Sequence, residues 1–252
     1  MSTSGVTQAS GLEQEYNGDY QLQVARGLVN GHTAIFRAAY SPYITTGQNY
    51  SVWPRAATYV FPTVASTMTL SSSATGDVGQ LVLVTGLDNT YASISEVLVL
   101  NGQTPVSSVT SFFRVNDILV LTDSPTGNIY FGTGTVTTGV PANVYGFIAA
   151  GDNTMMSAHY TVPAGHSLYI LGGSVNTALA NQNKTVIVSF NTRINGVIYK
   201  GANIQSSGGY QHYPYTPPLA VTEKMDIWDT ATTSDGTPSS VTANLSGILI
   251  KN

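Results

Sequence analysis

The chain has 252 residues, of which only 9% are charged, none is Cys and 25 are Gly, and its formal net charge is −4 at neutral pH. Without Cys it can form no disulfide framework, thiol nucleophile or thiolate zinc motif, and without a basic excess it makes a poor partner for nucleic acid. The longest apolar runs have strand length and the first residues lack a signal-peptide pattern, so we expect a soluble protein with no membrane contact.

Residues 1–40 contain Gln, Asn, Gly and scattered charges, without a clean alternation of apolar and polar side chains. This composition predicts an extended N-terminal arm that becomes ordered on a neighbouring subunit. We expect the backbone from Gln21 to Arg26 to add to the edge of a neighbour's strand. The candidate partner-binding residues of the arm are Gln23, Arg26, His32 and Arg37.

After the arm, short runs rich in Val, Ile, Leu, Phe and Tyr alternate with clusters of Gly, Asn, Asp, Ser and Pro. No helical period is sustained, so this pattern predicts an all-β protein, an antiparallel β-sandwich of jelly-roll type. The predicted strands are Leu81–Thr85, Ile94–Leu100, Val109–Val115, Ile118–Leu121, Asn143–Ile148, Met156–Val162, Ser167–Leu171, Thr185–Phe190, Val197–Lys200, Asp226–Thr230 and Val241–Ile250. A polar turn at Ala149–Asn153 divides them, which predicts one sandwich over residues 41–150 and a second over residues 151–252.

Two connections have a specific chemistry. Asn195 and Gly196 accept positive φ angles, so they predict a hairpin with a type I′ turn. The segment Gly208–Pro218 contains three prolines, which are disfavoured inside a sheet, and we expect it to be a surface loop. Its tyrosines offer rigid contact area, so we also assign partner binding to Tyr210, Tyr213 and Tyr215.

No motif points to catalysis. The four histidines lie in separate contexts without metal-ligand spacing, and His159, inside a predicted strand, is expected to be structural. Four carboxylates in or beside strands would have to pair in space for glycoside hydrolysis: Glu96, Asp117, Asp226 and Asp229. We therefore expect a protein that is not an enzyme, with no catalytic residue, cofactor or metal, and a calcium site near Asp77 or Asp152 stays an open alternative.

Ten short motifs occur in an order that resembles a known group of proteins. They are Gln23–Gly27, Gly31–His32, Trp53, Tyr59–Pro62, Ser71–Ala74, Gly76–Asp77, Gly86–Asp88, Val99–Gly102, Tyr160–Gly165 and Glu223–Ile227. In this order they resemble virion structural proteins of tailed bacteriophages of aquatic bacteria, mainly over residues 20–170. The resemblance implies a component of a phage particle.

Low charge, the predicted arm and this resemblance lead to one main hypothesis. The chain is expected to be a capsid cement or decoration protein that binds the major capsid protein and itself, as a homo-oligomer that we expect to be a trimer. Its expected location is the outer capsid surface of the virion, after synthesis in the host cytoplasm. The alternatives are a receptor-binding fibre module that recognises host glycans through tyrosine loops, and a tailspike-like depolymerase that needs a carboxylate pair.

Overall fold

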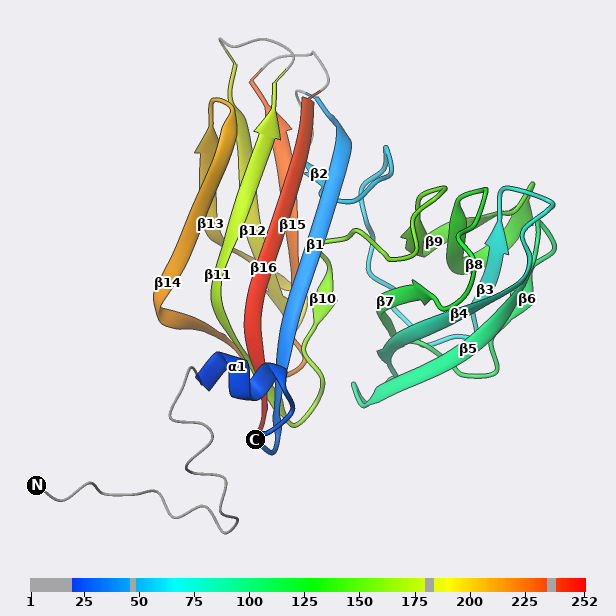
Figure 1. Cartoon of the computed structure of the whole chain (residues 1–252), viewed down its shortest axis with the longest axis horizontal. Coiled ribbons are helices and arrows are strands. Elements are labelled where there is room, and N and C mark those ends of the chain that lie inside the picture. Colours follow the sequence, from blue (N-terminus) through cyan, green and yellow to red (C-terminus); the bar gives the residue numbers. More distant parts are fainter. Residues whose placement is uncertain (1–19, 46–48, 180–183, 235–238) are drawn as a thin grey trace, which may run out of the picture.

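The computed structural model describes residues 20–45, 49–179, 184–234 and 239–252. These residues form two β-sandwiches that lie side by side (Figure 1). The strand pairs are antiparallel, and α1 (Tyr20–Ala25) is the one helix in the described ranges. The predicted all-β, antiparallel fold is confirmed.

The larger sandwich is a jelly roll, and its strands come from both ends of the described chain. One sheet has the order β1 (His32–Ile44), β16 (Ser239–Lys251), β11 (His166–Ala178) and β14 (Gly209–Val221). The other has the order β10 (Tyr160–Thr161), β15 (Asp226–Thr233), β12 (Val186–Ile194) and β13 (Val197–Ser206), with β2 (Tyr50–Ser51) also paired to β15. Four consecutive connections from β12 to β16 thus include three that cross between the sheets, which is the connectivity of a jelly roll.

The second sandwich is inserted between β2 and β10. Both of these short strands pair with β15, at Ala231 and Thr230 for β2 and at Ile227 and Asp226 for β10. Its sheets have the orders β6 (Val106–Ser107), β3 (Thr69–Ser72), β8 (Ile129–Thr137), β9 (Val140–Ile148), and β5 (Ser93–Asn101), β4 (Val78–Leu87), β7 (Arg114–Val120). We call β3 to β9 the inserted sandwich.

The structure corrects the expected arm for residues 20–40. Tyr20–Ala25 form α1, so β-augmentation by Gln21–Arg26 is wrong for this conformation. β1 pairs with β16 of the same chain from His32 to Ile44, with one register shift after Ser41. The inward face of β1 carries small or polar side chains such as Ala39 and Ser41, which is why the strand lacks an apolar alternation in the sequence. Residues 1–19 of the expected arm lie outside the described residues.

The expected division into consecutive domains also differs from the arrangement seen. The boundary expected at residue 40 falls inside β1, and both β1 and β2 pair with strands that follow residue 151. Hydrogen bonding between distant segments, rather than position along the chain, therefore decides which strands share a sandwich.

The proline-rich segment is a strand, not a loop. β14 is the edge of its sheet, where a missing N–H faces solvent, and prolines are tolerated at such edges. Its pairing with β11 shifts between Gly172, opposite Pro214, and Ile170, opposite Leu219, so Pro217 and Pro218 lie in the irregular stretch. By contrast, the predicted hairpin is confirmed: Ile194 pairs with Val197, and Asn195 and Gly196 have φ angles of 50° and 80°.

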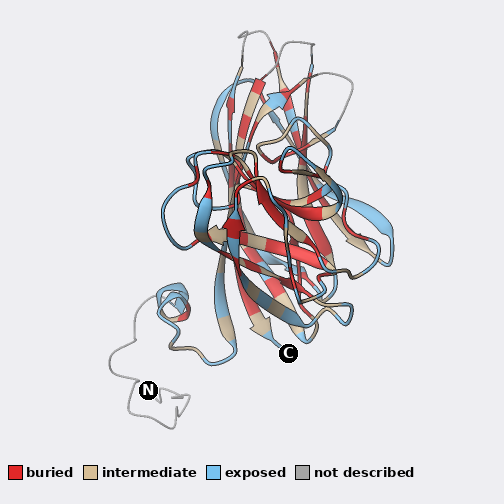
Figure 2. Ribbon diagram, turned by 90° about the vertical axis from the view of Figure 1, so that its right-hand side faces the viewer, coloured by how far each residue is buried: buried red, intermediate tan, exposed pale blue. Residues whose placement is uncertain are grey.

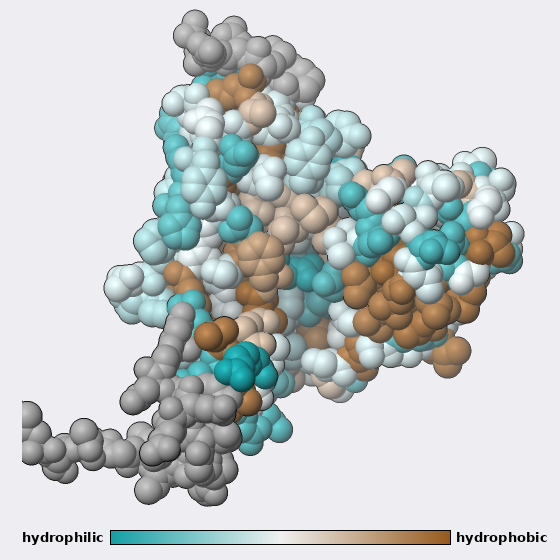
Figure 3. All heavy atoms as spheres, in the orientation of Figure 1, coloured by the Kyte–Doolittle hydropathy of each residue, from teal (hydrophilic) through white to brown (hydrophobic). Residues whose placement is uncertain are grey.

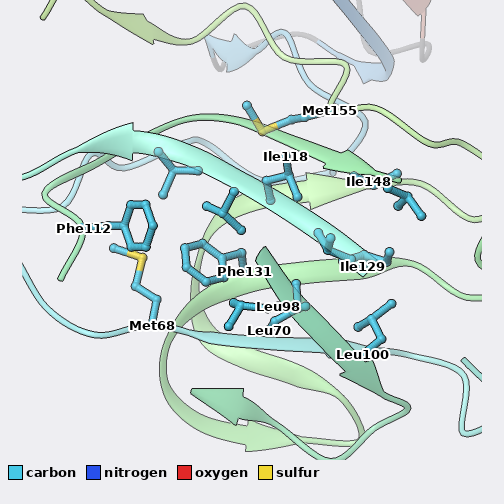
Figure 4. Close-up of a cluster of buried hydrophobic side chains, with 14 residues drawn as sticks. Met68, Leu70, Leu98, Leu100, Phe112, Ile118, Ile129, Phe131, Ile148 and Met155 are labelled. Atoms are coloured by element: carbon cyan, nitrogen blue, oxygen red, sulfur yellow. The ribbon is translucent and has the colours of Figure 1, made fainter. Parts of the chain in front are cut away.

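The cores lie between the sheets of each sandwich, where the buried residues gather in Figure 2. The inserted sandwich has one continuous cluster, drawn in Figure 4, in which Phe112 and Phe131 meet edge to face at 5.3 Å. The jelly roll has two clusters, one around Val175 and Val241 and one around Leu168 and Ile227.

Candidate functional site

The outer side of the sheet β5-β4-β7 is apolar where a sandwich normally presents polar side chains. The register places Leu81 opposite Val99, and Leu83 opposite both Val97 and Leu119. Val97 and Val99 are 50% and 48% exposed, while the intervening Leu98 is buried in the core. We define the apolar face as Leu81, Leu83, Val97, Val99, Leu119 and Leu121.

Figure 3 shows the apolar face as a hydrophobic patch on the inserted sandwich. Contiguous exposed apolar side chains of this kind mark interaction surfaces. The sequence carries a signal for it that strand prediction alone did not use: Leu81–Val84 and Val97–Leu100 are apolar without interruption. Such runs are typical of strands that are covered on both faces.

A buried ion cluster joins the two sandwiches. Asp226, at the start of β15, accepts hydrogen bonds from Arg114 Nε of β7 at 2.7 Å and from Arg193 Nε of β12 at 2.9 Å. Thr161 Oγ1 donates to the same carboxylate at 2.6 Å. The guanidinium of Arg114 also lies 4.0 Å from the ring centroid of Phe113, which helps to compensate for two cations meeting one anion.

A second set of contacts lies beside this cluster. Arg37 Nη1 donates to Asp117 at 2.8 Å. Asn116 and Thr161 exchange two hydrogen bonds, each of 2.9 Å, between the amide group of Asn116 and the backbone of Thr161. These bonds fix the orientation of the inserted sandwich on the jelly roll.

Aromatic side chains fill the rest of the junction. Trp53, Tyr59 and Phe61, in the link from β2, pack with Tyr130 and Phe147 of the inserted sandwich. His159 lies among these rings, stacked on Tyr59 with a centroid distance of 3.7 Å. Burial, and to a lesser extent the charge of Arg37, lowers the pKa of His159 to about 3, so the imidazole is neutral at physiological pH and serves in packing.

The four carboxylates considered for hydrolysis have separate surroundings. Glu96 accepts hydrogen bonds from the backbone N–H groups of Val109 and Thr110, which outweigh burial and lower its pKa. Asp117 and Asp226 are paired with arginines, as described above. Asp229 faces the interior of the jelly roll, where burial raises its pKa to about 7. No pair of these carboxylates shares a groove among the described residues.

The sequence left open a calcium site near Asp77 or Asp152, and these two carboxylates have different surroundings. The carboxylate of Asp77 accepts hydrogen bonds from Ser72 Oγ, from Thr126 N and Oγ1, and from Gly127 N. These donors use its oxygens and lower its pKa in spite of burial. Asp152 is exposed in a turn before Asn153. In the described part of the chain no three His, Cys, Asp or Glu residues lie close enough to hold a metal ion.

The partner-binding residues assigned to the arm do not converge. Gln23 is half-buried on α1, and Arg26 is exposed just after that helix. His32 begins β1, and its ring lies edge-on to the ring of Tyr20. Arg37 is paired with Asp117 of the same chain, and its expected role as an anchor for a neighbour stays a prediction.

The three tyrosines of β14 that were assigned to partner binding do not share one surface. Tyr210 is largely exposed. Tyr213 donates a hydrogen bond to Gln211, and Tyr215 packs against the core cluster that contains Leu168. Tyr213 and Tyr215 both line a cavity of about 40 Å³ inside the jelly roll. Alternation along the strand therefore separates an outward tyrosine from two inward ones.

Comparisons with known proteins do not assign this chain to a family. No family model matches the sequence, and no curated protein is significantly similar to it. The solved structure titled infectious bursal disease virus Gx strain matches with 12% identity and a TM-score of 0.25, over 88% of this chain and 73% of that one. The VP2 subviral particle of the same virus matches with 12% identity and a TM-score of 0.23, over 88% and 72%. At these scores the likeness carries no conclusion about this chain. In the described residues no helix is long and apolar enough to cross a membrane.

Proposed function

We propose that this chain is a non-enzymatic structural protein of a virus particle, and more narrowly a phage capsid cement or decoration protein. The observation that carries the proposal is the apolar face, which a monomer would leave in water. Its exposed valines and leucines lie side by side in register across three strands and include no charged side chain. Covering such a surface with another protein is favourable in proportion to the apolar area removed from water.

Three further features support this function. Jelly rolls are common in capsid and lectin domains, although a fold alone does not define a function. The motif order from Gln23 to Ile227 resembles phage virion proteins. The carboxylates that hydrolysis would need are engaged elsewhere or isolated. We infer a homo-oligomer, with a trimer as the expected state, that binds the major capsid protein on the outer surface of the particle.

The first test is the association state of the purified full chain, measured by sedimentation velocity over a wide concentration range. The cement hypothesis predicts a discrete small oligomer. Closed shells formed by the chain alone would instead make it a coat subunit, and a monomer of 26.5 kDa at every concentration would contradict the oligomer.

The second test is a cryo-EM map of the virus particle that carries this chain. We expect density for the jelly roll and the inserted sandwich on the outer capsid surface, with the apolar face covered. Particles that lack the chain should lose their DNA at a lower temperature. If such particles resist heat equally well, or if the chain lies on the tail, the cement function is wrong.

A further inference from the structure

A cleft of about 360 Å³ opens where the two sandwiches meet, between the end of β1 and the link from β9 to β10. Figure 1 shows this link passing beside β1. Tyr40, Pro42 and Tyr43 line one side, and Phe147 with Asp152 and Asn153 line the other. A cleft of this volume lies in the usual range of sites for small ligands.

The aromatic side of the cleft has unused binding capacity. Tyr40 and Tyr43 both line the cleft and are 38% and 44% exposed. Their hydroxyls make no hydrogen bond within the described residues. Each tyrosine therefore offers a flat apolar ring together with a free polar tip, at a small cost in conformational entropy.

The opposite side of the cleft supplies polar side chains whose hydrogen-bonding capacity is also unused. Asp152 and Asn153 are exposed, and their side chains make no hydrogen bond within the described residues. A carboxylate accepts hydrogen bonds, while an amide both donates and accepts them. Among the described residues that line the cleft none is Lys, Arg or His, and Asp152 is the one charged side chain.

From this combination we propose that the cleft binds a neutral sugar ring of a glycan. The apolar C–H face of the ring packs on Tyr40 or Tyr43, and its hydroxyls donate to Asp152 and exchange hydrogen bonds with Asn153. A phosphate or an acidic sugar is disfavoured because no lining cation offsets the repulsion from Asp152. A purely apolar ligand would leave the carboxylate and the amide desolvated without partners.

This inference goes beyond the proposed structural function and is independent of it. A capsid-bound protein with such a site would attach the particle to a glycan-bearing surface, whereas a cement protein without it would only stabilise the shell. The site needs both sandwiches, because the tyrosines belong to the jelly roll and Phe147 belongs to β9. The ion cluster around Asp226 holds the two sides in place.

The experiment uses the full chain and four probes: the methyl pyranosides of glucose, galactose, mannose and N-acetylglucosamine. Binding is measured by ligand-observed NMR and by titration of tyrosine fluorescence. For a single ring we expect a Kd on the order of 1 mM for at least one probe, and no competition by inorganic phosphate. Failure of all four probes to bind at tens of millimolar would overturn the proposal.

Variants locate the binding. Tyr43→Ala should weaken it about tenfold, the upper range for one aromatic contact. Tyr43→Phe should keep most of it, because the ring remains, and Asp152→Ala should weaken it severalfold. Tyr199→Ala is the matched control, an exposed tyrosine on β13, and should leave the Kd unchanged. Equal Kd values for the wild-type chain, Tyr43→Ala and Asp152→Ala would contradict the site. Particle incorporation, measured separately, reports on the cement function alone.

Discussion

The two sandwiches differ in how their cores are packed. The core of the inserted sandwich is one cluster of apolar side chains, with Phe112 and Phe131 at its centre. The core of the jelly roll is split into two clusters. Between them lie Asp229 and Asn244, which line cavities of about 40 and 10 Å³. The inserted sandwich has an uninterrupted apolar core and a partly apolar outer side, while the jelly roll has a polar seam, Asp229 and Asn244, in its interior.

This difference between the cores gives the inserted sandwich and the jelly roll different physical properties. A continuous apolar core holds the sheet β5-β4-β7 rigid while its outer side presents the apolar face. A polar seam costs stability, because the half-buried carboxyl group of Asp229 has lost part of its hydration. We therefore expect the jelly roll to respond to pH and the inserted sandwich to respond to loss of core volume. The variants below test that contrast in order of decreasing effect.

The largest effect is expected in the core of the inserted sandwich. Phe131→Ala removes a fully buried ring and should lower the free energy of unfolding by about 4 kcal/mol. Denaturation by urea, followed by far-UV circular dichroism, measures it. Phe36→Ala, an exposed ring on β1, is the control and should change stability by no more than about 0.5 kcal/mol. Similar losses for both variants would contradict the assignment of the core.

The next largest effect is expected at the junction. Asp226→Ala leaves Arg114 and Arg193 facing each other without their shared anion and should cost about 3 kcal/mol. Because the cluster joins the sandwiches, we also expect their unfolding transitions to separate in calorimetry. Asp117→Ala removes a carboxylate that is 42% exposed and should cost about 1 kcal/mol or less. A single transition with unchanged midpoint in Asp226→Ala would show that the cluster does not couple the sandwiches.

The polar seam predicts a pH dependence with a definite sign. The pKa of Asp229 is raised to about 7 in the folded chain, against about 3.9 when unfolded. Between these values the folded state keeps a proton that the unfolded state releases. Stability therefore falls as pH rises through this window, by up to about 1.4 kcal/mol per pH unit, and this contribution is constant above it.

Asp229→Asn, measured by urea denaturation at several pH values, should remove this decline. The groups that face Asp229 across the cavities are Tyr213 and Tyr215 of β14, Asn244 of β16 and Arg37 of β1. Burial raises the pKa of Tyr213 and of Tyr215 above the usual value of 10, so neither phenol titrates within this window. Asp117→Asn is the matched control and should keep the decline. An unchanged slope in Asp229→Asn would mean that the buried carboxyl is ionised throughout.

The smallest change in stability belongs to the apolar face, where the effect should appear in association instead. Val97→Thr combined with Val99→Thr keeps β-branched side chains and should alter the free energy of unfolding by no more than about 0.5 kcal/mol. The double variant should nevertheless weaken self-association in sedimentation velocity. Val197→Thr with Ile198→Thr, exposed on β13, is the control. Loss of association in the control alone would move the interface to the jelly roll.

Local chemistry in the sequence predicted several features correctly. The Asn195–Gly196 turn depends on two residues that accept positive φ, and β12 and β13 formed on either side of it. The all-β class followed from short apolar runs between turn residues. Those features depend on neighbours in the chain, so the sequence displays them directly.

The candidate sites were harder to predict for a physical reason. Arg37 was assigned to a partner but pairs with Asp117, which is 80 residues away in the sequence. The cleft brings Tyr43 close to Asp152 only because a whole sandwich is inserted between β2 and β10. Contacts of this kind depend on closing long loops, and a pattern of local residues does not encode which loops close.

The sequence by itself thus determined the class of structure, the low content of charged residues, and the absence of thiol chemistry. Only the tertiary structure decided that β1 joins β16 rather than a neighbouring subunit, that β14 is a strand with three prolines at a sheet edge, and that the runs Leu81–Val84 and Val97–Leu100 leave one side in solvent. The reason is common to all three. Strand pairing satisfies backbone N–H and C=O groups that all residues except proline carry alike, so the partner is chosen by the geometry of the whole fold.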